Sequence, residues 1–461
     1  MVILGVETSC DETALALIEA EDDSVRVLAD ITHSQAALHA KYGGVFPNLA
    51  KREHSRNLIP LLKNLLAESG FGNPKSQAPR LPIGGQANSL PAPNRLRQAG
   101  KQIQSVKSKT LNAKRSTLNA IFEREPELWE QFERFIPTIE KPPIDAIAVT
   151  YGPGLEPALW VGINFAKALG VIWNIPVIPT NHMEGHIVSA LLRRNANSKS
   201  ETLNSLPAPN RLRQAGKQIL NSKSQILNAT RYTLHAIRFP AIALLISGGH
   251  TELVLVKKLG QYEIIGETKD DAVGEAFDKV ARILGLPYPG GPEISALAER
   301  ARQAKQGSTL ESGKRSNLVL PRPMLHSGDY HFSFSGLKTA VLYTVKKIPR
   351  VTAAIKQALA KEFEDSVTEV LISKTTKAIK EYEAKTLIIA GGVIANKHIR
   401  SAFEELRASA FPSLELLIPE IPHSTDNALM IAVAGYLNLK SGRRPAKGNE
   451  FIIIASGRVR L

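Results

Sequence analysis

Two histidines four residues apart, His182 and His186, are the sharpest chemical feature of the sequence; they lie in the stretch NHMEGH, 181–186. In a helix, residues four apart share one face, so both imidazoles could bind a single metal ion. Glu184 does not stand where the HExxH pattern of zinc proteases needs its glutamate, and it projects away from that face. The best candidate for a third ligand is Asp426 in the stretch HSTDN. The alternative is that Asp426 only caps a helix.

Two polar segments connect pairs of expected strands. The first is ETSCDET at 7–13, and the second is SGGHT at 247–251. Glycine pairs let backbone N–H groups approach an anion closely, and Ser and Thr hydroxyls add further donors. Either segment alone is more often a simple turn. Their equivalent places in two halves of the chain favour a phosphate-binding clamp.

The elements that would position these residues follow the same order twice. Alternating apolar patterns predict three strands, then helix and strand in alternation, in each half. The expected strands and helices of the first half are 2–8, 14–20, 24–30, 47–66, 144–150, 156–173 and 176–180. Those of the second half are 241–247, 251–258, 262–268, 271–286, 353–380, 386–392, 414–420 and a last helix from Asp426. This order indicates two similar α/β domains that face each other across a cleft.

Composition places the chain among ordinary folded proteins. It has 461 residues, of which 43% are apolar and 22% charged, and this length favours two domains. The single cysteine, Cys10, excludes disulfide scaffolds and multi-cysteine zinc folds. We expect no membrane span, because no apolar run approaches the ~20 residues that a span needs. The acidic start, with Glu7, Asp11 and Glu12, does not fit a signal peptide, so we expect a cytoplasmic protein.

The formal net charge of +15 comes from two segments. Residues 74–124 carry a net charge of +9 and residues 193–238 carry +8, so the rest is nearly neutral. The sequence NSLPAPNRLRQAGKQI occurs in both, at 88–103 and at 204–219. Such segments are too poor in apolar side chains to order themselves alone. We interpret them as flexible, copied insertions; the alternative is a pair of basic arms that bind RNA.

Eight stretches of the sequence together resemble the bacterial TsaD family, also called Gcp. The resemblance rests on eight blocks in order and covers the chain outside the two insertions. The blocks are ETSCDET, YGPGL, NHMEGH, LISGGHTEL, DDAVGEAFDKVARILGLPYPGGP, HFSFSGLKTA, IAGGVIAN and HSTDNALMIA.

The resemblance implies a duplicated fold of the actin, Hsp70 and sugar-kinase type (ASKHA), with two domains around a nucleotide cleft. We expect the domains at 1–180 and 181–461. The family's metal ligands fall on His182, His186 and Asp426, with Fe²⁺ favoured and Zn²⁺ as the alternative. Its ligand-binding positions fall on Leu245, Ile246, Ser247, Gly248, Gly249, Asp278, Gly291 and Asn396.

Two of these positions have a simpler interpretation, and one further residue departs from the family pattern. From the residues alone, Asp278 could simply solvate a helix face, and Asn396 could be a helix cap. Ser295 departs from the family, since many members have Asp there. This change puts in doubt one hydrogen bond, to a ribose hydroxyl, which Ser can make only more weakly.

The implied reaction transfers a threonylcarbamoyl group from threonylcarbamoyl-AMP to N6 of the adenosine 3′ of the anticodon in ANN-decoding tRNAs. A bound metal would act as a Lewis acid, and Gly248 and Gly249 would donate to the phosphate. Asp11 and Glu12 are the candidate general bases, as carboxylates of the first polar segment. The implied partners are tRNA, a paralogue of the same fold (TsaB-like) and a small ATPase (TsaE-like).

Three other functions compete with this one. A metalloprotease, the O-sialoglycoprotein endopeptidase of the family's older description, is disfavoured because the histidine pair lacks a correctly placed Glu. A small-molecule kinase of the same fold would not need a His-His-Asp metal site. A non-catalytic, nucleotide-dependent scaffold is the third alternative, and it predicts that metal-ligand variants keep their cellular function.

Overall fold

The computed structural model describes residues 1–71, 113–195, 230–307, 318–443 and 453–461. Both copies of the sixteen-residue repeat lie outside these ranges. The interpretation of the repeats as flexible insertions is therefore not tested within the described residues. No helix in these ranges combines the length and the apolar character needed to cross a bilayer.

The first sheet is built from seven strands. They are β1 (Val2–Glu7), β2 (Glu12–Glu21), β3 (Ser24–Ser34), β4 (Ala146–Gly152), β5 (Val177–Asn181), β6 (Leu192–Arg194) and β7 (Arg231–Leu234). Their order is β5-β4-β1-β2-β3-β7-β6. β1, β2 and β3 are antiparallel neighbours, whereas β4 runs parallel to β1 and β5 parallel to β4. The last pair between β1 and β2 is Glu7 with Ala14, and residues 8–11 connect the two strands.

The second sheet repeats this plan with five strands. They are β8 (Ala241–Ile246), β9 (Thr251–Lys258), β10 (Gln261–Glu267), β11 (Thr386–Ala390) and β12 (Glu415–Leu417). Their order is β10-β9-β8-β11-β12. The first three strands are antiparallel, and β11 and β12 are parallel to β8. These are the order and the relative directions of β3-β2-β1-β4-β5 in the first sheet.

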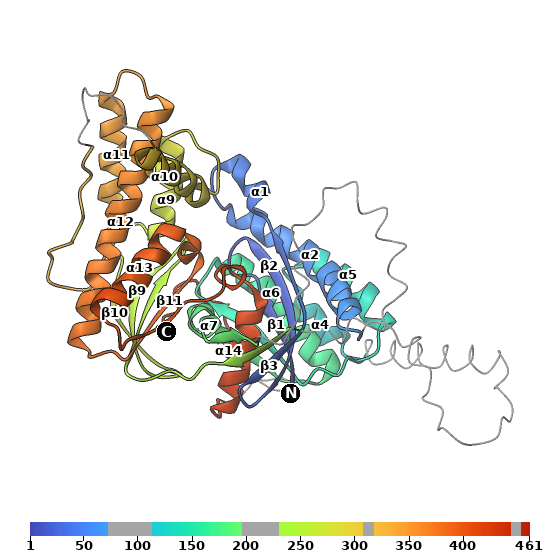
Figure 1. The fold of residues 1–461 in the computed structure, drawn as a ribbon. Coiled ribbons are helices and arrows are strands. Elements are labelled where there is room, and N and C mark those ends of the chain that lie inside the picture. The colour runs from blue at the N-terminus through green and yellow to red at the C-terminus, as the bar shows by residue number, and fades with distance from the viewer. Residues whose placement is uncertain (72–112, 196–229, 308–317, 444–452) are drawn as a thin grey trace, which may run out of the picture.

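The helices form layers outside and between the sheets (Figure 1). The helices of the first half are α1 (Ala36–His39), α2 (Pro47–Glu68), α4 (Arg115–Ile121), α5 (Pro126–Phe135), α6 (Glu156–Trp173) and α7 (His182–Ser189). Those of the second half are α9 (Val273–Ile283), α10 (Gly290–Gly307), α11 (Ser335–Lys347), α12 (Ala353–Glu381), α13 (Lys397–Ala410) and α14 (Ala428–Lys440). Short 3-10 helices are η1 (Ala40–Tyr42), η2 (Ile136–Thr138), η6 (Gly392–Ala395) and η7 (Ile421–His423).

Alternate strand residues face different cores, as the period of a strand requires. In β2, Ala14, Ala16 and Ile18 belong to a central core, whereas Leu15 and Leu17 belong to the core under α2, α4, α5 and α6. The second sheet behaves alike, with β8 contributing to the central core and to the core under α9 to α13. The central core thus lies between the sheets and contains α7 and α14.

Helix α14, near the end of the chain, packs against the strands with which the chain begins. Its residues from Ala428 to Tyr436 are all buried, as expected for a helix that is apolar all round. It packs on β1, β2 and β4 of the first sheet and on α7. This packing brings the residues just before α14 close to α7. The expected division of the chain at residue 180 stays a prediction.

The ordered core matches the expected order of elements. The strands of both halves and the helix at 156–173 are confirmed, while β12 is shorter than expected. The boundaries of the insertions were wrong, because α4 buries Leu118 and β7 buries Tyr232. Residues 113–124 and 230–238 therefore belong to the folded protein. The apolar side chains at these ends pack on neighbours that the sequence alone did not bring together.

Candidate metal centre and the neighbouring cavity

Helix α7 presents both histidines on one buried face. Asn181 caps its first turn, since its side-chain oxygen accepts hydrogen bonds from the backbone N–H groups of Met183 and Glu184, at 2.8 and 3.3 Å. The two imidazole rings have centroids 4.7 Å apart. Both histidines are almost completely buried. The predicted helical spacing of the pair is confirmed.

Asp426 approaches this pair from the segment before α14. One of its oxygens, Oδ1, lies 3.4 Å from His182 Nε2 and 3.2 Å from His186 Nε2. One ligand atom of each residue lies within 4.8 Å of the others. Asp426 is not the cap of α14, because the side chain of Asn427 accepts the hydrogen bond from Met430 N. The interpretation of Asp426 as a plain cap is therefore wrong.

Glu7, at the end of β1, fixes the orientation of the His182 ring. Its Oε2 lies 3.2 Å from His182 Nδ1 and accepts a 2.6 Å hydrogen bond from the Thr150 hydroxyl. Its Oε1 accepts from Ser9 N at 2.6 Å. A carboxylate on the far ring nitrogen is a common support of a metal-binding histidine. No role was predicted for Glu7 at the metal centre, since only the pairing of β1 with its neighbours brings it to α7.

The residues present fit a divalent metal ion. His186 is fully buried, and its Nδ1 has no hydrogen-bond partner among the described residues. Its Nε2 lies close to Asp426 but is not aligned for a hydrogen bond. A buried imidazole nitrogen without a hydrogen bond is costly unless a further partner completes it. Two imidazoles and one carboxylate suit iron and zinc alike, and they leave coordination positions open.

The carboxylates and imidazoles of the candidate metal centre shift one another's pKa values. Burial would lower the pKa of His182, but the carboxylates of Asp426 and Glu7 outweigh it and raise that pKa well above its usual range. Burial lowers the pKa of His186, so this imidazole is neutral with a lone pair to donate. Against the opposing effect of burial, the two histidines hold the pKa of Asp426 well below its usual range. A cation bound here would replace the proton that His182 otherwise carries.

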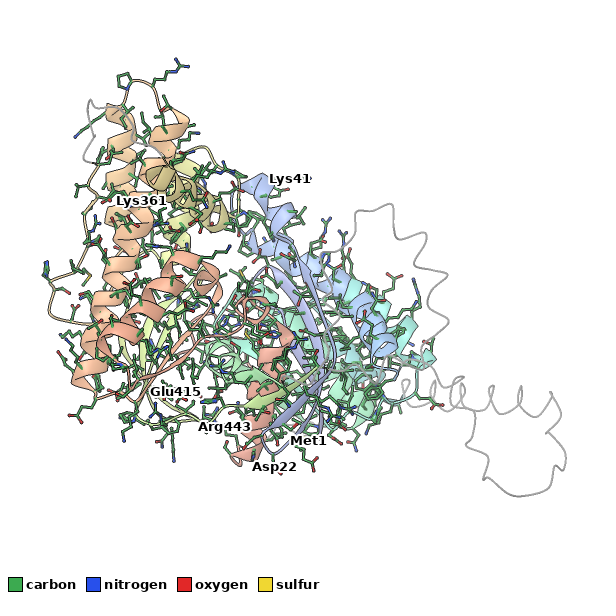
Figure 2. All side chains as sticks on the ribbon, viewed as in Figure 1. Met1, Asp22, Lys41, Lys361, Glu415 and Arg443 are labelled. Atoms are coloured by element: carbon green, nitrogen blue, oxygen red, sulfur yellow. The ribbon has the colours of Figure 1, made fainter. Side chains whose placement is uncertain are left out.

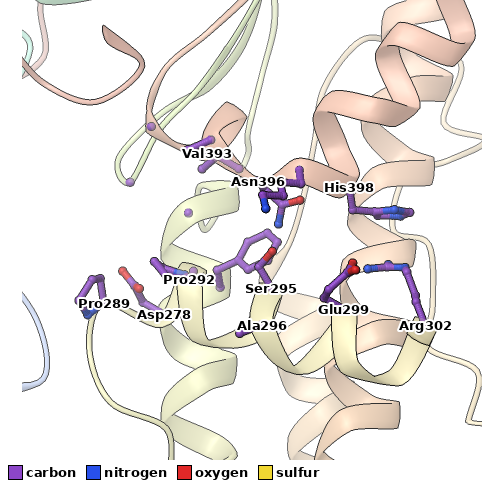
Figure 3. Close-up of a pocket in the computed structure, with 17 residues that line it drawn as sticks. Asp278, Pro289, Pro292, Ser295, Ala296, Glu299, Arg302, Val393, Asn396 and His398 are labelled. Atoms are coloured by element: carbon purple, nitrogen blue, oxygen red, sulfur yellow. The ribbon is translucent and has the colours of Figure 1, made fainter. Parts of the chain in front are cut away.

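A cavity of about 460 Å³ opens in the second half of the chain. Figure 3 shows Asp278 and Pro289 towards one end and His398 and Arg302 towards the other, with Asn396 between them. The cavity is lined by residues of α9, α10, η6 and α13 and by Gly248 of the loop between β8 and β9. Its lining is mostly apolar with a few polar groups, as in small-molecule sites.

The structure brings together only part of the predicted substrate site. Gly248, Asp278, Gly291 and Asn396 line the cavity, and so does Ser295. Leu245, Ile246, Ser247 and Gly249 do not line it. Leu245 and Ile246 are strand residues whose side chains are fully buried in the central and outer cores, respectively.

The cavity residues have defined local roles. Asp278 Oδ1 accepts a 2.7 Å hydrogen bond from Gly290 N and so holds the start of α10. Asn396 is the cap of α13, accepting from Ile399 N, and its amide donates to Glu364 at 2.6 Å. The interpretation of Asn396 as a helix cap is confirmed. A side chain added at Gly248 would meet no atom within 4 Å, so this backbone is open to a ligand.

Asp11 lies in the loop between β1 and β2, and Glu12 is the first residue of β2; neither lines this cavity. Burial, the neighbouring Asp11 and the more distant Asp426 raise the pKa of Glu12 to about 9. Glu12 also accepts a hydrogen bond from the Ser34 hydroxyl at 3.2 Å. Asp11 in turn raises the pKa of Asp278 in the cavity, as a minor contribution beside burial. The loop is therefore within electrostatic reach of both the metal ligands and the cavity.

The two sheets share one strand order, helices cover them, and a buried set of two histidines and a carboxylate lies near their common core. These features place the chain among α/β proteins with a candidate metal centre. Within this class, the model of the TsaD family, tRNA N6-adenosine threonylcarbamoyltransferase, matches residues 26–76, 137–201 and 219–433. The chain belongs to the TsaD family, and the predicted resemblance is confirmed. Its fold is the mixed α/β fold of that family, and as a family member it is a transferase.

Curated relatives of the chain support the same assignment. The tRNA N6-adenosine threonylcarbamoyltransferases of Burkholderia ambifaria (strain MC40-6) and Burkholderia vietnamiensis (strain G4) are each 37% identical to it over 455 residues. Each alignment covers 97% of this chain and 95% of the relative. Among solved structures, full-length HypF with bound phosphate and nucleotide has a TM-score of 0.38 and 13% identity, over 68% of this chain and 41% of that chain. A likeness this weak carries no functional information.

Proposed function

We propose that this protein transfers the threonylcarbamoyl group from threonylcarbamoyl-AMP to N6 of the adenosine 3′ of the anticodon in ANN-decoding tRNAs. The observation that carries the proposal is the buried set of His182, His186 and Asp426 in a chain of the TsaD family. The donor and the choice of tRNA go beyond what the relatives' names state. The cavity beside Gly248 and Asp278 has room for an adenylate.

We further infer a duplicated ASKHA fold with the nucleotide in its cleft. The matching strand order of the two sheets supports this inference. In such folds the loops at the first hairpin of each half face one another. Here these are the loop with Asp11 and the loop with Gly248.

In the proposed reaction, the N6 amine forms a bond to the carbamoyl carbon while the bond from that carbon to the phosphate oxygen breaks and AMP leaves. His182, His186 and Asp426 would hold the divalent ion, with Fe²⁺ favoured and Zn²⁺ as the alternative. When bound, such an ion supplies a Lewis acid for substrate oxygens. The backbone N–H groups of Gly248 and Gly249 would donate to the phosphate of the adenylate.

Asp11 is the residue to which we assign the proton released by the amine. Glu12, the second candidate, carries its own proton at neutral pH because of its raised pKa. A general base must be unprotonated before the reaction.

Contacts of Glu184 argue against the metalloprotease. Its two oxygens accept from the Tyr262 hydroxyl at 3.0 Å and from Asn438 at 3.1 Å, and Arg443 lies 3.3 Å away. A carboxylate occupied in this way is not available to activate a water molecule. No observation favours the small-molecule kinase or the scaffold over the transferase.

Partners and location follow from the family only. We propose that the protein works in the cytoplasm with a TsaB-like paralogue and a TsaE-like ATPase, in addition to tRNA.

A single-tube reaction tests the proposed function. It contains purified protein and partners, a defined tRNA transcript and synthetic threonylcarbamoyl-AMP, and the modified nucleoside is measured by mass spectrometry. We expect modification of a tRNA that decodes ANN codons and none of a transcript with guanosine at the target position. His182→Ala, His186→Ala and Asp426→Ala should lose both bound metal and product while remaining folded. Full product from a metal-free variant would refute the proposal.

A further inference from the structure

The segment between β3 and α2 carries a pair of exposed aromatic rings. Tyr42 is 64% exposed and Phe46 is 52% exposed. Their centroids lie 6.1 Å apart with planes inclined by only 26°, so the two rings are stacked. Among the described residues, the only other exposed aromatic side chain is that of Tyr343 on α11. Two adjacent solvent-facing rings are unusual on a protein surface and indicate a binding site.

A buried polar network ties this pair to the loop that carries Asp11. His39 Nδ1 accepts a 3.3 Å hydrogen bond from Phe46 N, and His39 Nε2 lies 3.2 Å from Gln35 Oε1. Gln35 N in turn donates to Asp11 O at 2.9 Å. His39 and Gln35 are both buried. The backbone at Phe46 is therefore held in a fixed relation to the candidate general base.

On its other side, the same segment reaches the helix beside the cavity. Arg282 of α9 donates a hydrogen bond to the carbonyl oxygen of Gly43, which lies between the two aromatic residues in the sequence. α9 also carries Asp278, which lines the cavity. The aromatic pair thus belongs to a segment that bridges the Asp11 loop and the cavity wall.

Lys41 is the one Lys or Arg of this segment, and Arg52 follows Phe46 by six residues, on α2. Both are exposed and form no ion pair with any residue that the structure describes. Lys41 stands at the outer tip of this segment, beside α1 (Figure 2). Aromatic rings beside unpaired cations are the usual composition of a surface for single-stranded nucleic acid.

We propose that Tyr42 and Phe46 form a stacking platform for unpaired bases of the RNA loop that contains the target adenosine. This inference rests on the proposed function. An enzyme that reacts with one base must take that base out of its stack, and the neighbouring bases then lose their partners. The two rings replace these partners, while Lys41 and Arg52 contact the backbone phosphates.

Binding of an RNA stem-loop to the full-length protein tests the platform. The probe is an anticodon stem-loop with a fluorescent label, and affinity is measured by anisotropy at two salt concentrations. Tyr42→Ala and Phe46→Ala should each weaken binding roughly 5- to 150-fold, the effect of losing one stacked base. The salt dependence should stay the same, because neither ring carries charge, whereas Lys41→Ala should reduce it.

Controls separate stacking from folding. Tyr343→Ala removes an aromatic ring of similar exposure elsewhere and should bind like the wild type. Tyr42→Phe and Phe46→Trp keep a ring and should restore affinity. Affinity for threonylcarbamoyl-AMP, measured by calorimetry, should be unchanged in all variants. In the transfer assay, the alanine variants should raise KM for tRNA more than they lower kcat.

The outcomes distinguish this inference from the proposed function. If the wild type transfers the group but the alanine variants bind RNA equally well, the platform is wrong and the function stands. If the variants lose RNA affinity but the wild type transfers nothing, the platform stands and the function is wrong. Absence of stem-loop binding by the wild type overturns the platform. Variants that lose only a protein partner also overturn it.

Discussion

Glu7 connects the first strand to the candidate metal centre. Its carboxylate contacts His182 Nδ1 on the side of the ring away from Asp426, and Thr150 and Ser9 fix its position. We expect Glu7→Gln to weaken metal binding about 10- to 100-fold, because a neutral amide orients and polarises the imidazole less. Competition with a chromogenic chelator measures this affinity. Glu19→Gln, in a partly exposed pair with Arg26, is the control, and equal affinities of both variants would contradict the assigned role.

The raised pKa of Glu12 predicts that the stability of the protein depends on pH. Its pKa is raised to about 9 by burial first and by Asp11 and Asp426 next, so folding favours the protonated carboxyl. The unfolded carboxyl ionises near pH 4.5. The stability that this group contributes is therefore complete below about pH 4.5 and is lost as the pH rises to about 9. Glu12→Gln removes this loss.

Thermal melts of the chelator-treated protein test this prediction. The melting temperature of the wild type should fall further between pH 5 and pH 9 than that of Glu12→Gln. Titrating groups that do not interact with Glu12 contribute equally to both proteins and cancel in the comparison. Parallel curves would show that Glu12 ionises normally in the folded chain.

At the scale of elements, two similar four-residue stretches show the limit of local prediction. RSTL at 115–118 lies in helix α4, whereas RYTL at 231–234 forms strand β7. The two stretches differ in the second residue, Ser116 against Tyr232. Tyr232 is buried and lies 2.9 Å from His423 through its hydroxyl, and β7 pairs with β3. Packing on neighbours decides the structure, so no reading of these residues alone could have predicted both outcomes.

Leu118 and Leu234 occupy equivalent places in the two stretches and make a matched pair. Leu118 is fully buried beside Phe122, whereas Leu234 is only partly buried. We expect Leu118→Ala to lower the free energy of unfolding by about 2–5 kcal/mol, the usual loss for a buried leucine. Leu234→Ala should cost clearly less. Denaturant unfolding of both variants measures the difference, and equal losses would mean that α4 is not part of the core.

Much of the site was predictable from local patterns. Strands with alternating apolar residues and the His-x-x-x-His spacing specify their own structure, and both were confirmed. The contact of Asp426 with α7 depends on α14, which returns to the first sheet from the far end of the chain. Asp426 was predicted from the sequence as a third metal ligand, with helix capping as the alternative. Only the folded structure shows that Asn427 caps α14 instead.

At the scale of the whole molecule, the basic charge and the core belong to different parts of the chain. The family match omits residues 77–136 and 202–218, which overlap the two basic segments. Within these segments, residues 75–110 and 198–228 lack a patterned apolar face, and long loops cost little to close. We therefore expect the transferase to work without residues 75–110 and 198–228. The exposed cations at Lys41 and Arg52 remain when the segments are removed.

Two deletions of different width test this expectation. The narrow one removes 75–110 and 198–228, and the wide one removes 74–124 and 193–238. The wide deletion should lower the melting temperature, because it removes the buried side chains of Leu118 and Tyr232. The narrow one should leave stability, turnover and tRNA affinity unchanged.

If the segments are RNA-binding arms instead, the narrow deletion removes cations that meet phosphates, so tRNA affinity falls and its dependence on salt flattens. Measuring tRNA affinity of the wild type and the narrow deletion at two salt concentrations separates these outcomes, and a weaker, flatter response would overturn the expectation of passive insertions.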